Sequence, residues 1–193
     1  MTKKELRKLF LEKRKALSEA EFSRLNFSLF SKFFAAVDLS SIHVLHCYLP
    51  MTAHKEPNTW LILDQIQSEF PNVRICIPRV SGDMLENIAY EGREQLQLSS
   101  WGIPEPSWGD LVPAGTIDLV LVPLLAVDKY GHRVGYGKGF YDRLLRLVKP
   151  DCRKVGLSFF EPVEAVDDAE IHDIPLDECI TPLGSVMFKR RDG

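Results

Sequence analysis

One stretch of the chain combines closely spaced glycines with cations and a carboxylate, and it reads VDKYGHRVGYGKGFYDR. Because glycine has no Cβ, the alternating Gly135, Gly137 and Gly139 allow the backbone to take positive φ and to lie close to a ligand. Arg133 and Lys138 place two cations in the same loop, which suits an anion such as phosphate. From the glycines alone, a loop that only makes turns is an equally good interpretation.

The glycine loop leads into a predicted helix. Phe140, Leu144, Leu147 and Val148 recur at three- and four-residue steps. The loop therefore ends at a helix N-terminus, where free N–H groups and the helix dipole favour an anion. The glycine spacing matches neither the Walker loop, in which Ser or Thr follows the lysine, nor the dinucleotide fingerprint. The working hypothesis is a phosphate-binding loop of another kind.

Asp142 lies in the first turn of this predicted helix. A carboxylate there suits the helix dipole, but it would repel a phosphate bound at the same end. A divalent cation between the two would remove the conflict, because Mg²⁺ is typically held by one or two carboxylates plus substrate phosphates. Asp142 is therefore a candidate metal ligand, and an ordinary helix-start Asp is the alternative.

The composition is that of an ordinary globular protein. The 193 residues are 45% hydrophobic and 26% charged, which is enough for a real core. The formal net charge of −3 gives no global attraction to nucleic acid or to an anionic membrane. No secretory signal or membrane span is expected, and the four cysteines show no paired spacing, so a reducing, cytoplasmic location is expected.

Basic residues follow one edge of the predicted N-terminal helix, residues 3–17. Lys3, Arg7 and Arg14 fall at positions i, i+4 and i+11, beside the apolar face. Such a row is usually a solvated flank, but a row that borders the buried face is better placed to reach into a cleft. Ser18 then begins a second helix with a capping box.

Predicted strands alternate with predicted helices along the chain. The strands cover residues 42–49, 73–78, 84–90, 117–123, 154–159 and 179–181, with an edge strand near 186–188, and a further helix covers 56–70. This order predicts one α/β domain over residues 1–193: a mostly parallel sheet with helices on both faces, a three-layer α/β/α sandwich of Rossmann-like type.

Ligands of such sheets bind outside the carboxyl ends of the strands. Glu56, Arg79 and the glycine loop each follow a predicted strand, so we expect them to converge. Residues 96–113, rich in Pro and Trp, are expected to be irregular, either as a packed pocket wall or lid or as a plain surface connection. His43 and His46 fall on opposite faces of a strand and are interpreted as structural.

The longest motif resembles the signature of the 5-formyltetrahydrofolate cyclo-ligase family, also called methenyltetrahydrofolate synthetase. Residues 128–142, DKYGHRVGYGKGFYD, are similar to the family pattern Asp-x-x-Gly-x-Arg-x-Gly-x-Gly-x-Gly-aromatic-Tyr-Asp. The resemblance covers nearly the whole chain. Weaker marks agree with it in order: Lys3 to Arg7, Glu56, residues 77–79, residues 101–106 and His172-Asp173.

The resemblance implies an α/β sandwich and a specific reaction. In the family, ATP and Mg²⁺ activate the formyl oxygen of 5-formyltetrahydrofolate as a phosphorylated imidate. The neighbouring nitrogen attacks, and 5,10-methenyltetrahydrofolate forms with release of ADP and phosphate. This chemistry consists mainly of positioning and charge stabilisation, so it needs no Ser, Cys or His nucleophile.

The resemblance also implies a role for each matching residue. ATP, the co-substrate, would be bound by Lys3, Lys4, Glu5, Leu6, Arg7, Arg133, Val134, Gly135, Tyr136, Gly137, Lys138, Gly139, Phe140 and Tyr141. The folate would be bound by Leu49, Glu56, Tyr136, Gly137, Lys138, Gly139 and Phe140, with Glu56 accepting from the pterin amino and N–H groups. The Mg²⁺ cofactor would be held by Asp142 and Asp173. Tyr136 stands where some members carry a basic residue, and the loop 50–55 is longer than in some members.

The expected partners are therefore small molecules, a reduced folate and ATP, with no nucleic acid and no membrane, and the chain is expected to act as a monomer. A non-catalytic folate- or nucleotide-binding paralogue is the alternative. The presence of Lys138, Tyr141 and Asp142 together favours the enzyme. A nucleic-acid binder that uses the basic N-terminal helix is a third hypothesis, which the acidic net charge disfavours.

Overall fold

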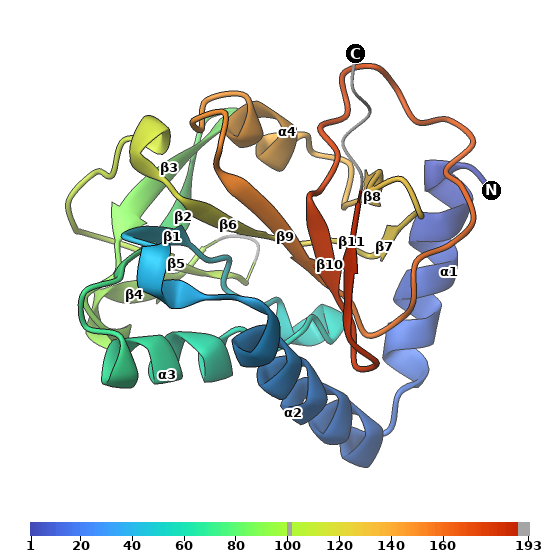
Figure 1. Cartoon of the computed structure of the whole chain (residues 1–193), viewed down its shortest axis with the longest axis horizontal. Helices are drawn as coiled ribbons and strands as arrows, with labels where there is room; N and C mark the ends of the chain where they lie inside the picture. Colours follow the sequence, from blue (N-terminus) through green and yellow to red (C-terminus); the bar gives the residue numbers. More distant parts are fainter. Residues whose placement is uncertain (100–101, 189–193) are drawn as a thin grey trace.

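A central sheet organises the computed structural model, which describes residues 1–99 and 102–188. Within these residues seven strands form the sheet in the order β11-β10-β9-β6-β1-β2-β3 (Figure 1). Their bounds are β1 Val44–His46, β2 Arg74–Ser81, β3 Met84–Ala89, β6 Leu119–Val122, β9 Arg153–Leu157, β10 Glu178–Ile180 and β11 Ser185–Met187. Neighbouring strands are parallel except at the two edges, where β3 and β11 run antiparallel to β2 and β10. The predicted mostly parallel α/β sheet is confirmed.

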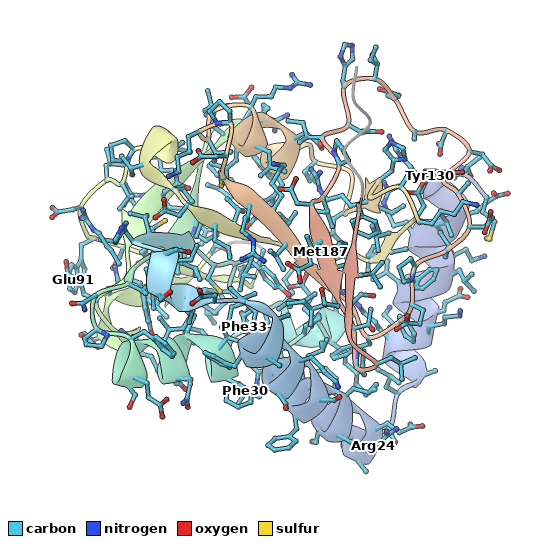
Figure 2. All side chains as sticks on the ribbon, in the orientation of Figure 1. Arg24, Phe30, Phe33, Glu91, Tyr130 and Met187 are labelled. Atoms are coloured by element: carbon cyan, nitrogen blue, oxygen red, sulfur yellow. The ribbon has the colours of Figure 1, made fainter. Side chains whose placement is uncertain are left out.

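Helices cover both faces of this sheet (Figure 1). Along β6, Leu119 and Leu121 belong to the core shared with α2 (Glu19–Ala36) and α3 (Trp60–Glu69), whereas Val120 and Val122 belong to the core shared with α4 (Phe140–Leu145). Side chains alternate between the faces of a strand, so a strand that is buried on both faces needs this continuous apolar run. Phe33 of α2, wholly buried, is part of the first core (Figure 2).

The first helix, α1 (Lys3–Ala16), packs on a small hairpin at the side of the sheet. The hairpin pairs β7 (Ala126–Val127) with β8 (Arg133–Val134), and α1 lies beside both strands (Figure 1). Leu6 and Phe10 of α1 share a third apolar cluster with the hairpin. The predicted capping box at Ser18 is confirmed, because its side chain accepts from the Glu21 N–H at the start of α2.

Three predicted elements are shorter than expected, for local reasons. The strand expected over 42–49 pairs only over β1, after which the chain leaves the sheet. The helix expected from residue 56 begins at Trp60, because the Thr59 hydroxyl bonds the Tyr48 carbonyl. The helix expected to reach Val148 ends at Leu145, where i to i−3 bonds tighten the chain ahead of Pro150.

The segment expected to be irregular contains a short hairpin, β4 (Leu96–Leu98) paired with β5 (Pro104–Pro106). Trp101 lies outside the described residues. Four 3₁₀ turns complete the elements in the described part of the chain: η1 Leu39–Ser41, η2 Thr52–His54, η3 Arg93–Gln95 and η4 Ala114–Thr116. None of the helices formed by the described residues is long and apolar enough to cross a membrane. All four cysteines are free and buried, and burial raises the pKa of Cys76, Cys152 and Cys179 to about 12.

Candidate active site

A cavity of about 640 Å³, called the central pocket here, opens where the chain leaves β1 and β6. From β1 the chain runs to β2 on one side, and from β6 it runs to β9 on the other side. When two adjacent parallel strands send their connections to opposite sides, a crevice forms outside their carboxyl ends. Ligands of open α/β sheets bind in this crevice. The volume falls within the range of about 300–1,000 Å³ that is usual for small-molecule sites.

The central pocket brings together most of the residues predicted for the site. Among its lining residues are Lys3, Arg7, Leu49, Glu56, Arg133, Gly135, Tyr136, Gly137, Lys138, Gly139, Phe140, Tyr141, Asp142 and Asp173. They come from α1, the loop after β1, the glycine loop, α4 and the segment before β10. Segments more than a hundred residues apart in the sequence therefore share one cavity.

Two glycines of the loop have the predicted left-handed backbone, and one does not. Gly137 has φ +85° and Gly139, the N-cap of α4, has φ +71°. Gly135 does not use this freedom, because its φ is not positive. The Gly135 carbonyl accepts a hydrogen bond from Arg7 Nε at 2.8 Å, which ties the loop to α1. A Cβ at Gly137 would lie 3.3 Å from Arg7 Nη2, so the missing side chain makes room for the guanidinium.

Two cation–carboxylate pairs line the pocket. Lys3 Nζ lies 2.6 Å from Asp173 Oδ2, and Arg133 Nη2 donates to Asp142 Oδ1 at 2.6 Å. Arg133 Nη1 also donates to the Ile174 carbonyl at 2.7 Å, which draws the segment around Asp173 toward α4. The Lys3 ammonium and the Glu170 N–H hold the pKa of Asp173 below its usual value, against the effect of burial. These contacts place two carboxylates and two cations in one wall.

Glu56 is the buried carboxylate of the pocket, with 3% of its surface exposed. Oε2 accepts from the Met51 N–H at 2.6 Å, whereas Oε1 is buried and has no hydrogen-bond partner among the described residues. Burial raises the pKa of Glu56, and the Met51 N–H, the Tyr136 hydroxyl and the Arg14 charge oppose that rise. A buried, unpaired acceptor costs free energy unless a ligand supplies a donor.

Aromatic side chains form the rest of the wall near Glu56. The rings of His54 and Tyr136 stack with centroids 5.3 Å apart. Tyr141 lines the pocket and shares a hydrogen bond of 3.1 Å with Nε2 of His46, whose Nδ1 bonds Asn87. Burial lowers the pKa of His46 to about 4, so the ring is neutral near pH 7. The interpretation of His46 as structural agrees with its place behind the pocket wall.

Several predicted residues lie elsewhere. Arg79 does not follow a strand: it lies within β2 and pairs with Glu86, while its neighbours Pro78 and Val80 face the pocket. Because alternate residues of a strand point to opposite faces, Arg79 must point away. The residues Lys4, Glu5, Leu6 and Val134, expected to bind ATP, are not among the pocket-lining residues; Lys4 and Glu5 are exposed on α1, and Leu6 and Val134 are in the core.

The sequence reasoning missed a group of uncharged and aromatic lining residues, together with Glu105: Tyr48, Met51, His54, Pro78, Val80, Leu85, Ile103, Pro104 and Pro123. The loop rich in Pro and Trp was one signal for them, because Ile103, Pro104 and Glu105 do form pocket wall. The described residues contain no cluster of three or more side chains suited to a metal ion. Any metal here would therefore need ligand atoms from a substrate as well as from Asp142 and Asp173.

Known proteins share both the sequence and this architecture. The model of the 5-formyltetrahydrofolate cyclo-ligase family matches residues 1–182. The chain belongs to the 5-formyltetrahydrofolate cyclo-ligase family. The cyclo-ligase of Mus musculus is 30% identical over 194 residues, which cover 92% of each protein. The cyclo-ligase of Mycoplasma genitalium is 26% identical, and the match covers 97% of that protein.

Solved structures of the family agree with the fold. The NMR structure of the 5,10-methenyltetrahydrofolate synthetase from Aquifex aeolicus aligns with a TM-score of 0.85 at 30% identity, over 100% of this chain and 96% of that one. The synthetase from Mycoplasma pneumoniae aligns at 0.75 with 26% identity, over 93% of this chain and 98% of that one. The family resemblance predicted from the glycine motif is confirmed, and with it the assignment to an enzyme family of ligases.

Gly137 and Gly135 offer a matched test of the loop geometry. Gly137→Ala is expected to destabilise the protein by about 1 kcal/mol or more, because alanine is strained at positive φ. The added Cβ would also crowd Arg7. Gly135→Ala should cost less, since its φ is not positive and no heavy atom lies within 4 Å of the added Cβ. Urea unfolding measures both, and equal losses of unfolding free energy would contradict the assigned roles.

Proposed function

We propose that this protein converts 5-formyltetrahydrofolate to 5,10-methenyltetrahydrofolate in a reaction that depends on ATP and Mg²⁺ and releases ADP and phosphate. Membership of the cyclo-ligase family supports the reaction class. The observation that carries the proposal is the make-up of the central pocket. One cavity is lined by a buried carboxylate with an unpaired oxygen and by a wall of cations and carboxylates.

The folate is assigned to the part of the pocket around Glu56. A reduced pterin presents amino and N–H donors along one edge, and an ionised carboxylate accepts only. Glu56 Oε1 is an acceptor that the described protein groups leave unpaired. Leu49 and the aromatic rings of Tyr136 and Phe140 line the same cavity and give the flat ring apolar surface. This combination of few polar groups and apolar walls is usual for small-molecule sites.

ATP is assigned to the glycine loop and to the basic row of α1. Lys3, Arg7, Arg133 and Lys138 all line the pocket, and the left-handed Gly137 and Gly139 expose the loop backbone. The reaction transfers a phosphoryl group to the formyl oxygen, giving a phosphorylated imidate. The neighbouring nitrogen then attacks that carbon and gives up its proton, and phosphate leaves. The protein contributes position and positive charge, which are the main needs of phosphoryl transfer.

The carboxylates of the pocket fit a magnesium ion. Asp142 uses Oδ1 to bind Arg133, and Asp173 uses Oδ2 to bind Lys3 and the Glu170 N–H. Carboxylate oxygens together with phosphate oxygens are the ligands that Mg²⁺ takes in nucleotide sites. Asp142 and Asp173 would hold the ion, which offsets phosphate charge when it is bound. The same proposal includes a monomeric, cytoplasmic enzyme, and four free buried thiols are consistent with a reducing compartment.

Turnover tests the proposal directly. The purified chain incubated with 5-formyltetrahydrofolate and Mg-ATP should raise the absorbance of the methenyl product and release ADP in equal amount. Omission of ATP or of Mg²⁺ should abolish the signal. Tight 5-formyltetrahydrofolate binding by a folded chain that consumes no ATP would instead favour the non-catalytic paralogue.

Glu56→Gln should weaken folate use much more than ATP use. A charge-assisted hydrogen bond is worth about 1.5–3 kcal/mol, so the KM for the folate should rise by about tenfold or more. The KM for ATP should change by no more than about twofold, within the range of an indirect effect. Glu69→Gln, an exposed change at the end of α3, serves as the control. Equal effects on both substrates would rule out the role assigned to Glu56.

Asp142→Asn should raise the Mg²⁺ concentration needed for half-maximal activity by about tenfold or more, since the amide is a weaker ligand than the carboxylate. The KM for 5-formyltetrahydrofolate should change little. Asp151→Asn is the matched control, because the Asp151 side chain is 80% exposed and is not a pocket-lining residue. An unchanged Mg²⁺ dependence in a folded, active Asp142→Asn enzyme would contradict the assignment.

A further inference from the structure

Arg14 carries a wholly buried charge, although it is not one of the residues that line the central pocket. Its Nη2 donates to the Leu124 carbonyl, its Nη1 donates to the Tyr136 hydroxyl at 3.2 Å, and its Nε is buried without a hydrogen-bond partner. Among the described residues, no carboxylate lies within ion-pair distance of this guanidinium. Burying a charge is costly unless something compensates it.

Glu56 is the buried carboxylate on which the Arg14 charge acts. The Arg14 guanidinium acts to lower the pKa of Glu56, although the two side chains form no direct ion pair. Arg14 also acts on the two tyrosines around that carboxyl, Tyr48 and Tyr136, where its charge opposes the rise in pKa that burial causes. A buried cation and a buried carboxylate therefore act on the same two tyrosines without forming an ion pair.

The Tyr136 hydroxyl acts on both charges, and it binds Arg14 directly. Glu56 Oε2 is instead bonded to the Met51 N–H, and Oε1 stays unpaired among the described residues. An arginine can only donate, so the Tyr136 oxygen accepts from Arg14 Nη1 and its own proton is left to donate. The same hydroxyl acts to lower the pKa of Glu56, although no hydrogen bond joins the two side chains in this structure. The His54 ring, stacked at 25° on Tyr136, restricts the tilt of the tyrosine.

We propose that Arg14 is a positioning residue whose buried charge, held against the Tyr136 hydroxyl behind the pocket wall, keeps Glu56 ionised as an acceptor for the donor edge of the folate ring. The inference rests on the proposed function, because it assumes that Glu56 receives the folate. Arg14 itself touches no substrate. A protonated Glu56 would present a donor where the ring also presents donors, so its ionisation decides whether the folate binds.

The sign of the pH effect follows from the groups that face Glu56. Burial raises the pKa of Glu56, and the Met51 N–H, Tyr136 and Arg14 lower it. Tyr48 and Tyr141 also face the carboxyl, and burial raises the pKa of both well above 10, so neither titrates near neutral pH. Removing the Arg14 charge removes one lowering effect. The pKa of Glu56 then rises. When the pH is lowered, the variant therefore loses folate affinity at a higher pH than the wild type does.

Binding of 5-formyltetrahydrofolate without ATP, measured by calorimetry between about pH 5 and 9, tests this role, since the range spans a raised carboxyl pKa. In Arg14→Met the acid-side midpoint of affinity should rise by about one pH unit or more, which is about tenfold weaker binding below the midpoint. Arg14→Lys, which keeps the charge, should return the midpoint toward the wild-type value. Lys8→Met, an exposed change on the same helix, is the control.

Two further variants separate this role from a purely structural one. Tyr136→Phe removes a single oxygen atom and should move the midpoint in the same direction, so it carries the test even if Arg14→Met fails to fold. In a Glu56→Gln background, Arg14→Met should leave the pH dependence unchanged. If Arg14→Met and Tyr136→Phe both fold and keep the wild-type midpoint, the inference is overturned and the proposed function is not. A wild-type chain that binds no 5-formyltetrahydrofolate would overturn the proposed function, and the inference with it.

Discussion

The central strands β1 and β6 lie side by side, yet the chain leaves their carboxyl ends in opposite directions. The loops that begin there have backbone groups with no strand to pair with, and buried backbone groups need partners. Side chains supply them: the Thr59 hydroxyl bonds the Tyr48 carbonyl, Arg14 bonds the Leu124 carbonyl, and Arg7 bonds the Gly135 carbonyl. Two of these donors belong to α1, so the same contacts that satisfy the loops also dock the helix that completes the pocket.

Charge balance shapes the pocket in the same way. Lys3 faces Asp173 and Arg133 faces Asp142, so each cation is partly neutralised by a carboxylate of the same wall. Side chains of like charge left unpaired in a crevice would repel one another and cost free energy of folding. In the proposed reaction a nucleotide phosphate would compete for the cations, and a divalent ion would compete for the carboxylates. Binding of both together would exchange one balanced set of charges for another, so that neither the cations nor the carboxylates would be left unpaired.

Local patterns were enough to predict the fold and most of the pocket. The continuous apolar run of β6, the capping box at Ser18 and the left-handed Gly137 and Gly139 follow from properties of short segments. The sequence could not show on which face of β2 Arg79 lies, because a shift of one residue along the strand moves a side chain to the other face. The basic row of α1 was visible in the sequence. Which of its members would be buried depends on the hairpin packed against it, 110 residues or more away.

The shortness of α4 changes the physical basis of anion binding. Its six residues make fewer than two turns, so the dipole at its N-terminus is smaller than that of the longer helix predicted from the sequence. Positive charge at the glycine loop must therefore come mainly from side chains, and both Lys3 and Arg7 are donated by α1. The Arg7 bond to the Gly135 carbonyl spans 128 residues of sequence. The proposed phosphate site is therefore complete only after the first helix has docked, and a ligand that binds there would stabilise the docked helix as well as the loop.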